Sequence, residues 1–153
     1  QATVLQMALV GSAIANEGAI MQPYLVDGIY NANGERSFTG QPTKLMQAID
    51  AGTAERVLKV LEGVVSNGSG AAAAVEGVTV AGKTGTAERG DGTADSWFVG
   101  MAPADNAGVV VAVVIEDGGQ GYTGAPVARK IADQYFFGGT DAETVTDPGQ
   151  LLP

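Results

Sequence analysis

The sequence predicts an α+β fold, in which antiparallel strands carry helices on a face. Three strand-like runs follow one another in the second half of the chain, at residues 78–87, 96–102 and 109–116. Segments with helical spacing of apolar residues lie before and after these runs. The link at 103–108 is short, which favours antiparallel pairing of the last two strands. With 153 residues the chain is long enough for one ordinary domain and too short for two, and it contains no internal repeat.

Length and charge narrow the class of protein. The chain has 153 residues, of which 45% are hydrophobic and 16% are charged, so it can build a core. The formal net charge of −9 opposes binding to nucleic-acid phosphates or to an anionic membrane surface. We therefore expect no nucleic-acid partner.

The absence of two residue types, cysteine and histidine, limits the catalytic chemistry that the chain can carry. The sequence contains no cysteine and no histidine, which excludes disulfides, thiolate nucleophiles, the usual zinc sites and histidine-based triads. Any catalysis must use Ser, Thr, Lys, Tyr or carboxylates, and we expect neither a cofactor nor a metal. No apolar run approaches the roughly 20 residues of a membrane span. Because Gln1 is not an initiator methionine, we expect the chain to be a piece of a longer protein.

Two helices are expected in the first half. The T-x-x-Q spacing at Thr3 matches a capping box, and residues 4–15 favour a helix that stops by Gly18. A second helix should follow Asp50 or Thr53 and end at the SNGSG segment. Its apolar face is formed by Val57, Leu58, Leu61, Val64 and Val65.

A hairpin is expected between these helices. Residues 24–30 and the stretch around Phe38 read as two short strands. A turn at Asn33 and Gly34 would join them, since Asn-Gly is a strong hairpin signal.

A third helix is expected after the strands. The DGGQGYTGA segment reads as a flexible loop that leads to Pro126, a suitable first helical residue. The helix should carry a stripe of Val127, Ala128, Ile131, Ala132, Tyr135 and Phe136. We expect residues 1–137 to form the folded part and residues 138–153 a flexible acidic tail.

The strand at 109–116 raises a packing problem. It is apolar on both faces, yet in the simple order of the three strands it would lie on an open edge. A long apolar edge is an aggregation hazard, so something should cover it. We expect this cover to come from residues that the chain lacks. The alternative is that the hairpin at 24–38 pairs there.

The stretch VAGKTGTAE, residues 80–88, is the main chemical candidate. On an edge strand, Gly82 and Gly85 would let another backbone approach, so that an extended substrate could add to the sheet. Lys83 would supply a cation, and the two threonines hydroxyl donors for a carboxylate. The set suits an acyl substrate but has no nucleophile. Alternatively, Lys83 is a solvated lysine on an edge strand, and K-T-G alone is weak evidence.

The surrounding segments resemble one known family. K-T-G with S-x-x-K and S-x-N partners is the signature of penicillin-binding proteins and serine β-lactamases. Here VAGKTGTAE, DSWFVGMAP, an apolar strand and GGQGYTGAPVARKI follow in the order of the C-terminal part of a penicillin-binding protein transpeptidase domain. The segment ATVLQMALVGSAIANEGAIMQPYLV is similar to an earlier part of that domain. The resemblance covers about residues 1–137 and fits the monofunctional, class B type. It implies the C-terminal part of the penicillin-binding protein and serine β-lactamase fold, incomplete in this chain.

The resemblance also implies roles for residues of the motif. Lys83 would organise the active-site hydroxyls and attract the substrate carboxylate, which Thr84 and Thr86 would contact. The N–H of Thr86 would form part of the oxyanion hole, and Gly85 would permit close approach. Lys83 and Thr86 are therefore the catalytic candidates, and Thr84, Gly85 and Thr86 the substrate-binding ones.

Two motifs of the family are absent from this sequence. No serine has a lysine three positions later or an asparagine two positions later; the serines are Ser12, Ser37, Ser66, Ser69 and Ser96. The serine nucleophile is therefore expected outside this chain, which alone should be inactive. The implied partners are the N-terminal part of the domain (in the same protein or as a second polypeptide), a peptidoglycan stem peptide, β-lactams and a membrane glycosyltransferase of division or elongation. The implied location is the extracytoplasmic face of the bacterial membrane, with an anchor absent from this chain.

Two other interpretations stay open. The chain could belong to a serine β-lactamase or D,D-carboxypeptidase, in which case the complete protein would turn over penicillin or its substrate hydrolytically. It could instead belong to a non-catalytic penicillin-fold binding module, in which S-x-x-K would be lost.

Overall fold

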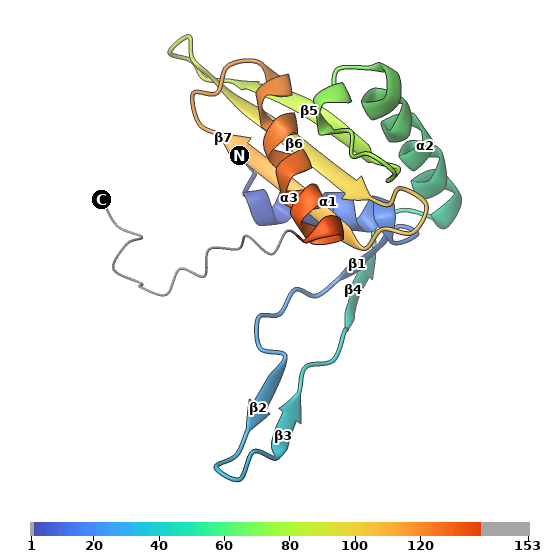
Figure 1. The fold of residues 1–153 in the computed structure, drawn as a ribbon, viewed down its shortest axis with the longest axis vertical. Coiled ribbons are helices and arrows are strands. Elements are labelled where there is room, and N and C mark those ends of the chain that lie inside the picture. Colours follow the sequence, from blue (N-terminus) through green and yellow to red (C-terminus); the bar gives the residue numbers. More distant parts are fainter. Residues whose placement is uncertain (1, 139–153) are drawn as a thin grey trace.

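The computed structural model describes residues 2–138, which form a three-stranded sheet with helices on both faces and a projecting arm of paired strands (Figure 1). The helices are α1 (Val4–Ala15), α2 (Ala51–Asn67) and α3 (Ala125–Phe137), with the 3-10 turns η1 (Ala71–Ala73) and η2 (Gly121–Gly124). The strands are β1 (Ala19–Met21), β2 (Gly28–Tyr30), β3 (Arg36–Thr39), β4 (Lys44–Gln47), β5 (Ala81–Glu88), β6 (Ala94–Ala102) and β7 (Val109–Ile115). The α+β prediction is confirmed. The predicted tail lies, from residue 139 on, outside the described residues.

Helix α1 begins and ends as predicted. The Thr3 hydroxyl oxygen accepts the Gln6 N–H at 3.1 Å, and the Gln6 side-chain oxygen accepts the Thr3 N–H at 2.8 Å. Beyond the helix, Gly18 has a φ of +84° and donates its N–H to the Ala13 carbonyl at 2.7 Å. A left-handed glycine at this point satisfies a carbonyl that the helix leaves free.

Asp50, rather than Thr53, caps helix α2. One Asp50 carboxylate oxygen accepts the Thr53 N–H at 2.8 Å, and the other accepts the Thr53 hydroxyl at 2.7 Å. These hydrogen bonds, that of the Thr53 hydroxyl first, hold the pKa of Asp50 below its ordinary value of 3.8. Of the predicted apolar face Val65 is fully buried, and its other members are half-buried.

The main sheet has the order β5-β6-β7, and both pairs are antiparallel. Its two faces form separate cores. On one face Phe98 is buried against Val113 of β7 and Ala128 of α3. On the other face Met101 is buried with Ala81 and contacts residues of α1 and α2. Strands β5 and β6 begin at Ala81 and Ala94, three residues later and two residues earlier than predicted.

The apolar stripe of α3 is only partly right. The buried residues of this helix are alanines, Ala125, Ala128 and Ala132, whereas Ile131 is 45% exposed. Because small side chains let the helix lie close to the sheet, the larger residues beside them remain outside. The helix also begins at Ala125, one residue before the predicted Pro126.

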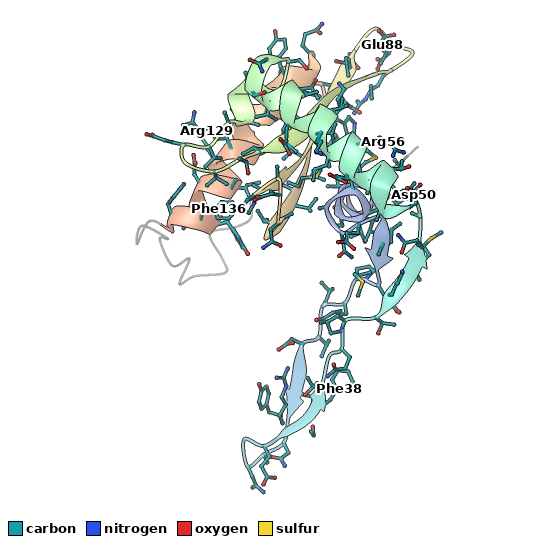
Figure 2. The ribbon with its side chains drawn as sticks, turned by 90° about the vertical axis from the view of Figure 1, so that its right-hand side faces the viewer. Phe38, Asp50, Arg56, Glu88, Arg129 and Phe136 are labelled. Carbon is teal, nitrogen blue, oxygen red and sulfur yellow. The ribbon has the colours of Figure 1, made fainter. Side chains whose placement is uncertain are left out.

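The hairpin does not cover β7, so that alternative is wrong. Strand β2 pairs with β3 at the far end, and β1 pairs with β4 nearer the sheet, so the whole segment forms an arm that leaves the body of the molecule (Figure 1). Figure 2 shows Phe38 on this arm, far from Glu88 at the end of β5. The predicted turn is present, with Gly34 at a φ of +80°. Strands β1 and β4 were not predicted, because three or four residues carry too little pattern.

The expected open edge is confirmed within the described residues. Strand β7 pairs with β6 alone there, and helices α1 and α3 cover its faces but not its edge. Among residues 2–138, no helix is long and apolar enough to cross a membrane.

Candidate functional site

The K-T-G residues lie in the middle of β5, which forms the other edge of the sheet. Pairing with β6 is continuous from Ala81 to Glu88, so the motif is fully extended. Within residues 2–138 no strand pairs with the outer side of β5. An extended ligand can therefore add to this edge through main-chain hydrogen bonds.

The register of β5 distributes the motif over two faces. Lys83 and Gly85 lie opposite Val99 and Trp97, on the face covered by α1. The two threonines lie opposite residues of the other face, which packs against α3 and η2. Since side chains alternate along a strand, a ligand running along the edge can contact the lysine and both hydroxyls.

The Lys83 side chain folds along its own strand. It is exposed, and its Nζ donates to the carbonyl oxygen of Thr84 at 2.8 Å. Beside it lies a hollow of about 350 Å³ between β5, β6, α1 and α2, lined by Met7, Leu61, Trp97 and other apolar side chains. A cation at the border of an apolar hollow is well placed to attract an anion.

Thr86 carries a contact that the sequence did not indicate. Its hydroxyl oxygen accepts the N–H of Gly121 at 2.8 Å. Opposite it in the register, the fully buried Ser96 accepts the N–H of Gly124 at 3.1 Å. The prediction of a flexible loop is wrong here, because these two hydroxyls dock η2 onto the sheet. The Thr86 proton remains free to be donated to an acceptor.

Gly121 also packs directly on the motif. A Cβ added at Gly121 would lie 2.7 Å from the carbonyl carbon and oxygen of Gly85 and 2.9 Å from its nitrogen. Only glycine allows this contact. The glycines of the DGGQG segment therefore include one that sets the back of the candidate site.

Thr84 is held at two of its atoms. Its carbonyl accepts from Lys83, and its hydroxyl lies 2.8 Å from the hydroxyl of Ser69, at the end of α2. In the sequence Ser69 stood out only as a candidate nucleophile, and no signal pointed to its contact with Thr84, 15 positions away.

Ion pairs of Arg89 hold the end of the β5–β6 hairpin in place. The Arg89 guanidinium pairs with Asp95 at 2.7 Å and with Asp117 at 3.3 Å. The hydrogen bond to Asp95 is the main cause that raises the pKa of Arg89. Asp95 also accepts the Asp117 N–H at 3.1 Å, so these contacts tie the start of the glycine-rich segment to the hairpin.

The chemistry of this set is binding and polarisation. It offers a cation, two hydroxyl donors and a free strand edge, which suit a carboxylate on an extended acyl ligand. Among residues 2–138, no group of three or more acidic side chains that could hold a metal ion is present. Lys83, Thr84 and Thr86 include no serine, and the Lys83 Nζ donates to a backbone carbonyl oxygen, that of Thr84.

Comparison with known proteins defines the class. The family described as "Penicillin binding protein transpeptidase domain" matches residues 1–136. The peptidoglycan D,D-transpeptidase PbpA of Mycolicibacterium smegmatis is 36% identical over 139 residues, which cover 83% of this chain and 28% of that protein. The penicillin-binding protein PbpB of Mycobacterium tuberculosis is 30% identical and covers 98% of this chain, with 25% of its own length matched.

Solved structures agree with these relatives. The D,D-transpeptidase domain of a peptidoglycan glycosyltransferase from Eggerthella lenta is 62% identical, with a TM-score of 0.82 over 88% of this chain and 33% of that one. Penicillin-binding protein A from M. tuberculosis, solved as an imipenem acyl-enzyme complex, is 30% identical with a TM-score of 0.81, over 88% of this chain and 31% of its own. The fold is thus that of a penicillin-binding protein transpeptidase domain.

The chain belongs to the penicillin-binding protein transpeptidase family. It spans about a quarter to a third of the length of the relatives named above. The predicted family and fold are confirmed.

Proposed function

We propose that this chain is the C-terminal part of a peptidoglycan D,D-transpeptidase and supplies the strand that binds the substrate carboxylate. The observation that carries the proposal is the K-T-G strand on a free sheet edge, with Lys83 exposed and both threonine hydroxyls on the same strand. The names of the relatives support the reaction class.

In the proposed reaction, a serine outside this chain attacks the penultimate D-alanine carbonyl of a stem peptide. The Thr86 N–H would stabilise the oxyanion, because a fixed backbone donor is effective where charge develops. The terminal D-alanine then leaves with a proton on its amine, and an ester joins the stem to the serine. An amine of a neighbouring stem attacks the ester, forms the amide and releases the serine with its proton restored.

Packing supports the view that the rest of the domain completes this site. The edge of β7 is unpaired within residues 2–138, and α1 leaves Leu5 57% and Val10 50% exposed. The hollow beside Lys83 is lined almost wholly by apolar side chains. A segment that filled the hollow would bury its apolar lining, which includes Val10, and would bring its own residues to Lys83.

The proposed ligands and partners follow from the same assignment. Penicillin-binding protein A of M. tuberculosis is described as acyl-enzyme complexes with imipenem and penicillin G, which supports β-lactam binding. We further propose that the complete protein is anchored at the extracytoplasmic face of a bacterial membrane. Its partner there would be a membrane glycosyltransferase of division or elongation.

Hydrolytic and non-catalytic alternatives are separable from this proposal. A serine β-lactamase or a D,D-carboxypeptidase would release the acyl group to water, whereas a binding module would form no acyl-enzyme. The transpeptidase names of the relatives favour transfer to an amine.

The role of Lys83 is tested by removing its charge. In the full-length protein that carries this segment, we expect Lys83→Met to slow acylation by penicillin about a hundred-fold or more, the range for loss of one preorganised group that stabilises charge. Lys130→Met is the matched control, because Lys130 is an exposed lysine on α3. Acylation of Lys83→Met at the wild-type rate would contradict the assignment.

A further inference from the structure

Ser69 occupies a turn built to present it. The N–H groups of Gly68 and Gly70 both point to the carbonyl of Val64, at 3.1 and 3.0 Å, and so close the end of α2. A Cβ at Gly68 would lie 2.9 Å from that carbonyl oxygen, and one at Gly70 would lie 3.2 Å from it. Two glycines are therefore needed around Ser69 for the chain to turn this tightly.

The turn aims the Ser69 hydroxyl at the K-T-G strand. Its Oγ lies 2.8 Å from Oγ1 of Thr84, a normal hydrogen-bond length between hydroxyls. Thr84 is half-buried and Ser69 is exposed. Because the Lys83 Nζ bonds the carbonyl of the same threonine, Thr84 is fixed at its backbone and at its side chain.

Counting protons gives this hydrogen bond a direction when a ligand is bound. A hydroxyl has one proton and two lone pairs, and an ionised carboxylate only accepts. If Thr84 donates to a substrate carboxylate, it has no proton left for Ser69. Ser69 must then be the donor, and Thr84 the acceptor, in their shared bond.

We propose that Ser69 is a positioning residue, which donates to the Thr84 hydroxyl and thereby directs the Thr84 proton to the carboxylate of the substrate or β-lactam. The inference rests on the proposed function, since it assumes that this strand binds that carboxylate. Ser69 touches no reacting atom and acts through Thr84 alone.

The test is a double-substitution cycle on acylation by penicillin in the full-length protein. We expect Ser69→Ala to slow acylation about three- to ten-fold, the usual effect of one neutral hydrogen bond. In a Thr84→Val background, the same substitution should cause no further loss, because the group it orients is gone. Ser69→Thr keeps the hydroxyl and should retain most of the rate. Ser66→Ala is the matched control on the same helix end, since the Ser66 hydroxyl oxygen accepts from the side-chain amide of the neighbouring Asn67.

A ligand comparison separates positioning from a structural effect. Ser69→Ala should lower the ratio of acylation by penicillin to acylation by its carboxamide, which lacks the charge. A purely structural role would slow both ligands equally and leave that ratio unchanged.

The outcomes also separate this inference from the proposed function. If wild type forms no adduct with penicillin, the proposed function fails. If it forms the adduct but Ser69→Ala leaves the ratio unchanged, or adds its full loss in the Thr84→Val background, the inference about Ser69 is overturned and the proposed function stands.

Discussion

At the scale of single residues, the site depends on which atoms the motif leaves free. Of the K-T-G strand, Lys83 is exposed, whereas the hydroxyl oxygens of Thr84 and Thr86 already have partners in Ser69 and Gly121. The motif itself could be predicted from the sequence, because its residue types suit a carboxylate. The partners could not, because Ser69 and Gly121 lie 15 and 35 positions away and meet the strand only through the fold.

Gly121 allows a direct test of the backbone contact behind the site. We expect Gly121→Ala to destabilise the full-length protein by about 1–3 kcal/mol, because the new methyl meets the backbone of Gly85, which cannot yield as a side chain can. Acylation should slow as the strand and η2 are pushed apart. Thermal unfolding and penicillin acylation measure the two effects. Gly90→Ala is the control, since nothing lies within 4 Å of its added Cβ, and equal behaviour of the two variants would refute the contact.

At the scale of elements, helix caps, helical spacing and apolar runs were the signals that predicted the structure. The helix α1 was predicted at its observed bounds because Thr3 and Gln6 make a capping box. Strands β6 and β7 were predicted because they are runs of mainly apolar residues. The arm was predicted only as a hairpin, since β1 and β4 pair far from the turn and depend on tertiary context. The stripe of α3 was misjudged because periodicity marks a face but not how closely that face approaches its neighbour.

The cap of α2 predicts a pH dependence. The pKa of Asp50 lies below 3.8 in the folded protein because the Thr53 hydroxyl and N–H bond its carboxylate. A lowered folded pKa means that the charge stabilises the fold above pH 3.8 and that this contribution is lost as pH falls through the folded pKa. Asp50→Asn keeps a capping side chain but removes the charge. We therefore expect the melting temperatures of wild type and Asp50→Asn to differ most near neutral pH and to converge in acid. A difference that stays constant from pH 7 to pH 2 would contradict this cause.

At the scale of the whole molecule, residues 2–138 leave part of their apolar surface and one strand edge uncovered. Among the large side chains of residues 2–138, only Phe98 and Met101 are almost fully buried, while α1 exposes Leu5 and Val10 and the outer edge of β7 has no strand beside it. Two independent observations in the sequence indicated that more of the domain lies outside this chain. The strand at 109–116 is apolar on both faces, and the S-x-x-K motif is missing. What the sequence could not indicate was the direction of the arm, which leaves the sheet where β1 pairs with β4.

The central claim is that this chain binds the ligand while a serine outside it forms the covalent bond. The most direct measurement is to acylate the full-length protein with labelled penicillin, digest it and locate the label by mass spectrometry. The account predicts label on a serine outside the 153 residues of this chain, and strong loss of label in Lys83→Met. Label on Ser12, Ser37, Ser66, Ser69 or Ser96 would contradict it, because the nucleophile would then lie within this chain.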